Sequence, residues 1–269
     1  MALSARTVGL WSTIPVAMTV SAALLWQVSY AAFSAPTTNP GNSFVAASSW
    51  CTEASCRSVL GQGPSFFWRL DEPSGSVAED QTSNGRTGSY VGGISRGVTA
   101  GLSGSSNPAI TLDGSTGYVT RSAADALTLP LTIQLRVRSS TDLGGPIVTF
   151  GDSQGGNSST TTAALYFGPN DGVSTGRVYF GVRTATGHVT VNSAYSQADG
   201  GWHDFSARIA ADGTLSLTYD GNTVTRSATP PTTTTGYWRV GREDLTGWPQ
   251  APSVSHLAGS VDEVRVLPS

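Results

Sequence analysis

The sequence predicts an all-β chain, a two-sheet antiparallel jelly-roll sandwich preceded by an N-terminal hydrophobic helix. The first observation is the segment LTIQLRVR at 131–138, in which apolar and polar residues alternate without a break. Successive side chains of a strand point to opposite faces, so this alternation describes a sheet with one buried and one wet face. The second observation is that the same alternation recurs at 177–183 and 214–219. The third is the presence of 32 Gly and 14 Pro, which suit short strands joined by tight turns.

The folded domain is expected to span residues 64–269, where strand patterns alternate with turn signals. The dipeptide DG at 212–213 and at 220–221 predicts a hairpin turn, because Gly tolerates a positive φ. No stretch after residue 50 shows sustained helical periodicity. Strands are expected near 65–70, 109–112, 116–120, 131–138, 145–150, 163–168, 177–182, 188–193, 202–210, 214–219, 222–226, 236–241 and 257–267.

Residues 1–31 are predicted to be a signal peptide or a membrane anchor. Arg6 is their only charge, and an apolar run follows from Val8 to about Val28. Small residues at Ser29 and Ala31 suit a signal-peptidase site, whereas the length of the run also suits an uncleaved anchor. In both cases the rest of the chain is expected to be secreted or to lie on the extracellular face of the membrane, with membrane contact only through this segment.

The segment AAFSAPTTNPGNSF at 31–44 resembles the region around the cleavage site of camelysin and of certain biofilm-matrix fibre proteins. In those proteins an aromatic residue follows the cleavage site, and a Ser/Thr/Asn-rich stretch leads to Gly-Asn-x-Phe. The resemblance covers about fifteen residues. It implies a route of export and says nothing about the activity of the domain that follows.

Residues 32–63 are predicted to be a flexible linker with a local Cys pair, because they are rich in small polar residues and lack periodicity. Cys51 and Cys56 are the only cysteines, and in an oxidising compartment a close pair favours a disulfide. The alternative, a metal site, would want more ligands nearby and a shorter spacing. A disulfide closing so short a loop would pin the linker rather than hold the fold together.

The net charge of −3 and the lack of a basic patch argue against nucleic acid as a partner. Neither a nucleophile elbow, a zinc-binding helix nor a phosphate-binding loop occurs in the sequence. Glycoside hydrolysis would need two facing carboxylates, but the acidic pairs at 71–72 and 262–263 are adjacent and so face opposite ways along a strand. The sequence therefore predicts a protein that is not an enzyme.

From residue 64 onward the chain resembles bacterial laminin-G-like, concanavalin A-like lectin jelly-roll domains. Seven segments carry the resemblance in the order of that family: FWRLDEPSG at 67–75, DQTSNGRTG at 80–88, LDGSTGYV at 112–119, WHDF at 202–205, LTYDG at 217–221, VGR at 240–242 and AGSVDEVRV at 258–266. Leu112 stands where the family usually has Phe, and the loop at 242–256 looks like an insertion. The resemblance implies a structural calcium ion held by Asp80, Asn84 and Asp262.

Asp262 shares strand parity with Val264 and Val266, so its side chain is expected to point toward the core. A buried carboxylate needs partners, because an unpaired buried charge is costly. A calcium ion is one candidate, since Ca²⁺ prefers carboxylate and carbonyl oxygens. Hydrogen bonds from backbone N–H groups at a turn are the other, and the sequence leaves both open.

Candidate ligand-binding residues lie in the loop that follows residue 241: Arg242, Asp244 and Trp248. An exposed Trp on a loop can stack on a sugar ring or enter a partner's surface. It can equally fold back as a lid over the sandwich. His203 shares parity with Phe205 and is expected to be a structural residue.

These observations favour a secreted or surface-tethered, non-catalytic recognition module that binds a glycan or a surface protein through loops at one rim. One alternative is a structural component of the cell envelope or of a biofilm matrix, suggested by the leader. A second is a glycoside hydrolase with an atypical carboxylate pair, for which Glu72 and Glu263 are the residues to test.

Overall fold

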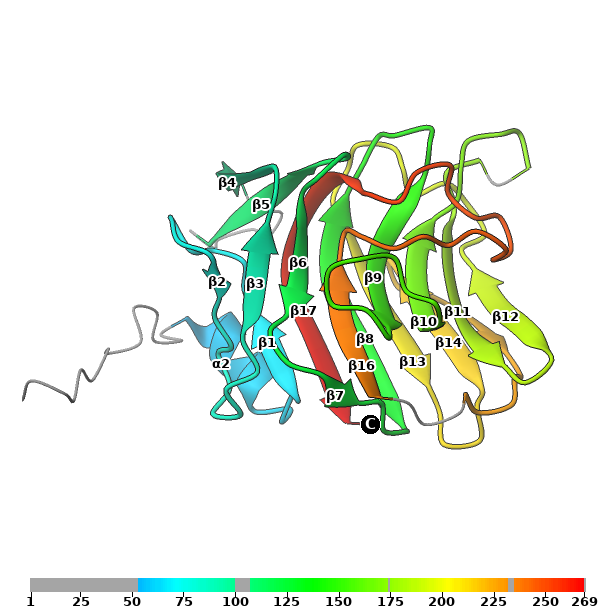
Figure 1. Ribbon diagram of the computed structural model, residues 1–269, viewed down its shortest axis with the longest axis horizontal. Helices are drawn as coiled ribbons and strands as arrows, with labels where there is room; N and C mark the ends of the chain where they lie inside the picture. Colours follow the sequence, from blue (N-terminus) through cyan, green and yellow to red (C-terminus); the bar gives the residue numbers. More distant parts are fainter. Residues whose placement is uncertain (1–52, 100–106, 174, 232–234, 269) are drawn as a thin grey trace, which may run out of the picture. The chain divides into compact units, whose positions relative to one another are not determined.

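The computed structural model describes residues 53–99, 107–173, 175–231 and 235–268 (Figure 1). Within these ranges the chain forms one short helix and strands only. In chain order the elements are α2 (Ala54–Leu60), β1 (Phe66–Trp68), β2 (Val77–Ala78), β3 (Gly88–Val91), β4 (Ile94–Thr99), β5 (Pro108–Asp113), β6 (Tyr118–Arg121), β7 (Asp125–Ala126), β8 (Leu131–Arg138), β9 (Gly145–Gly151), β10 (Thr161–Phe167), β11 (Val178–Thr184), β12 (Gly187–Asn192), β13 (His203–Ile209), β14 (Leu215–Tyr219), β15 (Asn222–Arg226), β16 (Thr235–Val240) and β17 (Ala258–Pro268).

The described strands form two antiparallel sheets that face each other (Figure 1). The eight-stranded sheet has the order β15-β14-β13-β8-β17-β5-β4, with β1 also paired to β17. The nine-stranded sheet has the order β12-β11-β10-β9-β16-β6-β3-β2, with β7 also paired to β16. The predicted all-β sandwich of two antiparallel sheets is therefore confirmed.

The core lies between the sheets and consists largely of the apolar residues that alternate with polar ones along the strands. On β8, the strand with the clearest alternation, Ile133, Leu135 and Val137 are buried. Gln134 and Arg136 occupy the opposite face and are half-buried. Aromatic residues fill the space at one end of this core, where Trp238 packs against Phe66 and Phe150. Burial of such apolar surface is the main favourable contribution to folding.

A short helix, α2, lies inside the segment predicted to be a flexible linker, and the sequence did not reveal it. Cys56 and Val59 of α2 are buried against Phe67, which β1 directs away from the main core. With only seven residues the helix has no room for a visible apolar period. Cys51 lies outside the described residues, so the disulfide between Cys51 and Cys56 stays a prediction.

Four strands were missed from the sequence, namely β2, β3, β4 and β7. Two of them have only two residues. Strand β4 is interrupted by a shift in pairing between Ser95 and Val98, and Gly97 between them has φ +70°. Such a bulge breaks the two-residue period on which strand prediction depends.

A second bulge changes the direction of Asp262. Along β17, Asp262 pairs with Arg136 and Arg265 pairs with Gln134, so one extra residue is inserted between them. Glu263 at this point has φ +56°, which is uncommon for a residue with a side chain. The insertion places Asp262 on the outer face of the sheet with Arg136. The prediction that Asp262 points toward the core is therefore wrong, although its side chain is fully buried.

The predicted leader and hydrophobic helix at 1–31, and the linker up to residue 52, lie outside the described residues. In the part of the chain that the structure describes, no helix has the length and apolarity needed to cross a membrane.

Candidate functional site

The loop that follows β2 holds two of the three residues predicted to bind calcium. Asp80 accepts hydrogen bonds from the backbone N–H of Phe67 (3.0 Å), Thr82 (3.0 Å) and Arg86 (2.7 Å), and from the Thr82 hydroxyl (2.7 Å). Asn84 donates through its amide to the carbonyl of residue 65 at 3.0 Å. Both residues therefore fasten this loop onto the start of β1.

The third predicted ligand, Asp262, makes its contacts elsewhere. The side-chain amide of Asn107 donates to Asp262 (3.4 Å) and to Glu263 (3.0 Å). Burial, and next the neighbouring charge of Glu263, raise the pKa of Asp262 to about 8. Its Oδ2 atom is buried without a hydrogen-bond partner. Glu263 also lies 3.7 Å from Arg69.

Calcium does not fit the donor set formed by these residues. Both carboxylate oxygens of Asp80 face N–H and O–H donors, whereas a Ca²⁺ ligand must present free oxygens. Within the described ranges no group of three or more His, Cys, Asp or Glu side chains gathers in a way that would hold a metal ion. Calcium binding by the whole chain stays a prediction.

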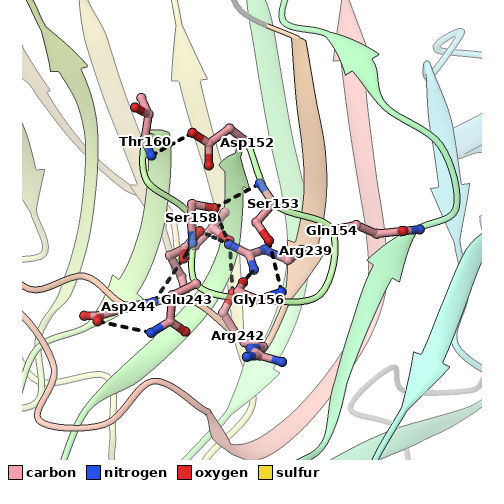
Figure 2. A network of polar contacts seen from close by, with 12 residues as sticks. Asp152, Ser153, Gln154, Gly156, Ser158, Thr160, Arg239, Arg242, Glu243 and Asp244 are labelled. Atoms are coloured by element: carbon pink, nitrogen blue, oxygen red, sulfur yellow. Dashed lines mark hydrogen bonds and ion pairs between the residues drawn. The ribbon is translucent and has the colours of Figure 1, made fainter.

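The outer face of the nine-stranded sheet is covered by two loops, 152–160 and 241–257, which Figure 1 shows in front of β9, β10 and β16. Arg239 of β16 and Glu243 of the second loop form an ion pair in which both side chains are fully buried. Figure 2 shows that Ser158 of the first loop joins them. The Arg239 guanidinium donates to the Ser158 hydroxyl (2.6 Å), and Glu243 accepts from the Ser158 N–H (3.1 Å).

Trp248 belongs to the same covering layer and is only 6% exposed. Its ring stacks on His188 at 4.3 Å between centroids and meets the edge of Tyr166 at 6.1 Å. The hydroxyl of Tyr166 donates to the carbonyl of Pro249 and fixes the loop. Of the two alternatives that the sequence leaves open for Trp248, the buried lid is therefore the arrangement observed.

The other two predicted ligand-binding residues also hold this layer in place. The Arg242 guanidinium lies over the ring of Tyr118 at 4.9 Å, a cation–π contact. Asp244 accepts from the Asn157 amide (3.4 Å) and from the Thr246 hydroxyl (2.7 Å). Figure 2 shows Asp244 at the left edge of the network and Arg242 below its centre. Ligand binding by these residues stays a prediction.

The three most exposed large apolar side chains of the described residues lie on loops that sequence reasoning did not single out. Leu143 is 52% exposed, Val173 is 67% exposed and Tyr195 is 73% exposed, the highest values among large apolar side chains of the described residues. They lie on the loops after β8, β10 and β12, residues 139–144, 168–173 with 175–177, and 193–202. We refer to these three loops as the rim.

Hydrogen bonds tie the rim loops to one another. The N–H of Asn170 donates to the carbonyl of Asp142 (2.7 Å), and the N–H of Gln197 donates to Gly176 (3.0 Å). The Gly200 N–H donates to the carbonyl of Ser139 (2.9 Å). These hydrogen bonds join the backbones of the three loops to one another.

His203 fastens the third rim loop to the turn between β14 and β15. Its Nε2 lies 2.9 Å from Asp199, and its Nδ1 lies 2.6 Å from Asp220. Burial lowers the pKa of His203, but the two carboxylates outweigh burial and raise it overall. The prediction of a structural role for His203 agrees with these contacts.

Glu72 and Glu263, the residues named for a hydrolase, are both engaged in structural contacts. Glu72 accepts the Tyr90 hydroxyl and, at 2.7 Å, the N–H of Glu79. Glu263 accepts the Asn107 amide and lies near Arg69. Neither side chain is free to act as a general acid or nucleophile in this arrangement.

The family model described as "Concanavalin A-like lectin/glucanases superfamily", a laminin G family, matches residues 113–269, more than half of the chain. No curated protein is similar enough in sequence to count as a relative. Among solved structures, the receptor binding domain of botulinum neurotoxin type G is similar with a TM-score of 0.53 and 8% identity, over 76% of this chain and 47% of that chain. The binding domain of Paraclostridial mosquitocidal protein 1 is similar with a TM-score of 0.53 and 8% identity, over 76% and 48%.

The binding domain of botulinum neurotoxin DC, solved in complex with rat synaptotagmin II, is similar with a TM-score of 0.51 and 8% identity, over 75% of this chain and 47% of that chain. The chain thus spans about half the length of these structures, and at such identity the likeness shows the fold alone. Fold and family match agree on the type of domain. The chain belongs to the concanavalin A-like lectin/glucanases superfamily.

Proposed function

We propose that this protein is an exported, non-catalytic recognition module that binds a surface protein through the rim. The observation that carries the proposal is the position of Leu143, Val173 and Tyr195, which present apolar surface on three adjoining loops. Exposed apolar surface on adjoining loops favours an interaction site, whereas a single isolated apolar side chain carries no such meaning. Export is supported by the apolar leader at 1–31.

The cross-links between the loops support binding by a preformed surface. Association costs free energy when loops must be ordered, and a rim already held by hydrogen bonds avoids part of that cost. The contact between Asn170 and Asp142 is doubled, because the Asn170 side-chain amide also donates to the Asp142 carboxylate at 2.8 Å.

A protein is favoured over a glycan as the partner. Sugar rings stack on flat aromatic faces, but two of the three exposed rim residues are aliphatic. The outer face of the nine-stranded sheet, another place for a glycan, is filled by the two covering loops and by Trp248. The similar domains include one solved in complex with rat synaptotagmin II, which is in keeping with a protein partner for this type of fold.

The test places a photo-crosslinking amino acid at position 195 of the full chain, with a second chain carrying it at Arg208 as the control. Arg208 is exposed on the outer face of the eight-stranded sheet, away from the rim. Crosslinking of one defined surface protein from position 195 alone identifies the partner. Its affinity is then measured for the wild type and for a chain with Leu143, Val173 and Tyr195 all changed to Ser.

Loss of interface anchors costs about 2 kcal/mol or more, which corresponds to a loss of affinity of about 30-fold. The triple variant is expected to lose at least that much, whereas Arg208→Met keeps the wild-type affinity. Binding of an immobilised glycan with no protein partner would refute the proposal. Crosslinking to a second copy of the chain would instead support the structural envelope or matrix role.

A further inference from the structure

The contacts of His203 connect the rim to a turn of the eight-stranded sheet. Its Nε2 lies 2.9 Å from Asp199 Oδ1 in the third rim loop, and its Nδ1 lies 2.6 Å from Asp220 Oδ2 in the turn between β14 and β15. The His203 side chain is only 13% exposed, whereas the two carboxylates are 59% and 43% exposed. The imidazole ring therefore lies between two carboxylates, and both of its nitrogens are in contact with one.

Both contacts can be hydrogen bonds only while the ring is protonated. An imidazolium has two N–H donors, but a neutral imidazole has one donor and one lone pair, and an ionised carboxylate can only accept. When His203 loses its proton, one ring nitrogen therefore faces a carboxylate oxygen with no hydrogen between them. One of the two contacts then becomes repulsive.

The contact with Asp199 is the one expected to open. It is the longer of the two, and the Asp199 carboxylate is the more exposed, so water can replace the imidazole there at a lower cost. Asp199 also keeps a partner in its own loop, since it accepts the Gly201 N–H at 2.8 Å. Asp220, by contrast, belongs to a two-residue hairpin turn in which its φ is +45°.

The other charged groups on the neighbouring strands are engaged with partners of their own. Arg136 of β8 and Asp204 of β13 form an ion pair at 2.7 Å. The Arg138 guanidinium lies over the ring of Trp202 at 5.2 Å. Among the described residues, the two carboxylates in contact with the ring are therefore the charged groups that decide the protonation of His203.

The direction of the pKa shifts agrees with this geometry. Burial lowers the pKa of His203, but the hydrogen bonds and charges of Asp199 and Asp220 outweigh burial and raise it overall. The hydrogen bond from His203 is the main cause that lowers the pKa of Asp199. The pair is thus stabilised in its charged form at low pH and is lost as the pH rises through the folded-state pKa of His203.

Asp199 occupies the part of the third rim loop that joins the other two loops. The Gln197 N–H donates to the carbonyl of Gly176 (3.0 Å), and the Gly200 N–H donates to the carbonyl of Ser139 (2.9 Å). Asp199 lies between these two donors in the chain, so a change at Asp199 acts on both hydrogen bonds.

The start of the same loop has a separate anchor. The N–H of Ala194 donates to the Tyr219 hydroxyl at 2.8 Å, a contact that does not involve His203. Opening of the Asp199 contact is therefore expected to loosen residues 197–201 and not to detach the whole loop.

We propose that His203 is a pH-sensitive switch that regulates binding at the rim. The protonated ring fastens the third rim loop to the β14–β15 turn, and loss of the proton loosens this loop and weakens binding. The proposal rests on the rim's binding a protein partner. Because both carboxylates are partly exposed, the expected change in affinity is about fivefold, at the lower end of the usual coupling between two sites.

The test uses the full chain between about pH 5.5 and about pH 8.5, on either side of a histidine pKa raised from its ordinary value of 6.5. One readout is the NMR order parameters of the Gln197 and Gly200 N–H groups, and an NMR titration of the His203 ring gives the midpoint. The other readout is the affinity for the surface protein that is crosslinked from position 195.

Asp199→Asn is the main variant. Its side-chain oxygen can accept from the protonated ring and its amide can donate to the neutral ring, so the contact persists in both states. His203→Gln removes the titrating group and decides the question if Asp199→Asn does not fold in thermal melting. His188→Gln is the matched control, because it removes a histidine at the opposite end of β12 from the third rim loop.

In the wild type and in His188→Gln, the order parameters and the affinity are expected to fall together as the His203 ring loses its proton. In Asp199→Asn and His203→Gln, neither should change over this range. The proposal is overturned if the order parameters stay constant while His203 titrates, if Asp199→Asn responds like the wild type, or if the affinity does not follow the loop.

Failure of the rim as a binding site is recognised separately, because the NMR readout needs no partner. In that case the loop responds to pH in the wild type although no protein is crosslinked from position 195. The converse result, a partner bound with the same affinity at every pH and a loop of constant order, overturns the switch and leaves the proposed function standing.

Discussion

Removal of the Glu243 carboxylate is the sharpest test of how the covering loops are held. Glu243 faces Arg239, and both side chains are fully buried. Glu243→Ala leaves the guanidinium buried without its counter-charge, which costs about 3–5 kcal/mol. The N–H groups of Ser158 and Asp244 also lose their acceptor, but they lie nearer to solvent and add less.

The free energy of unfolding, measured by urea denaturation with tryptophan fluorescence, reports the effect. Glu243→Gln keeps an acceptor for the two N–H groups and is expected to lie between the wild type and Glu243→Ala. The double variant Arg239→Met with Glu243→Leu removes both charges and should recover most of the loss, because an apolar pair of similar volume needs no counter-charge.

The pair Arg136–Asp204, in which Asp204 is exposed, supplies the comparison. The Asp204 side chain is 67% exposed, so Asp204→Ala should cost no more than about 1 kcal/mol. If Glu243→Ala costs as little as Asp204→Ala, or if the double variant is as unstable as the single one, the argument from burial is wrong.

Three further predictions follow from named residues. The pKa of Asp262 is about 8 in the folded chain and about 3.8 in the unfolded chain, so the wild type loses stability as the pH rises from 4 to 8. Asp262→Asn has no such group to ionise. The melting temperature of the variant relative to the wild type should therefore increase over this pH range. Gly92→Ala should destabilise the fold by more than about 2 kcal/mol in urea denaturation, because φ is +72° and the added Cβ would lie 2.0 Å from the carbonyl oxygen of Thr116. Asp220→Asn should lower the pKa of His203, because one of the two carboxylates that raise this pKa against the effect of burial is removed; an NMR titration of the imidazole ring measures this pKa. In the wild type the stability that the pair contributes is present at low pH and is lost as the pH rises through the folded-state pKa of His203.

The sequence predicted the sandwich well where strands keep one wet face. At β8 the expected and observed bounds are the same, because alternation continues to both ends of the strand. It failed where the signal is short or interrupted, as in the seven-residue α2 and in β4. The direction of Asp262 was wrong because one inserted residue at Glu263 reverses strand parity, and the apolar pattern does not record the insertion.

The candidate sites were harder to predict than the fold. From the sequence, Trp248 in its Gly/Pro-containing loop could be either a binding residue or part of a lid. Only its packing against His188 and Tyr166 in the structure decides between these two roles. Leu143 and Tyr195 have side chains typical of a core, so composition alone does not reveal their exposure. The sequence signal for the exposure of these residues was their position between strand patterns, in loops rich in small polar residues.

The pairing of β1 with β17 determines how the domain would respond to a pulling force. Phe66 pairs with Val266 and Trp68 with Val264, so the chain enters and leaves this pair at the same end. A force applied to the two chain segments that flank this pair would break its backbone hydrogen bonds one after another. This peeling geometry differs from shear, in which all the hydrogen bonds bear the load at once. Because β1 has only three residues, the first strand should peel away at low force, and the remaining sheet would then bear the tension.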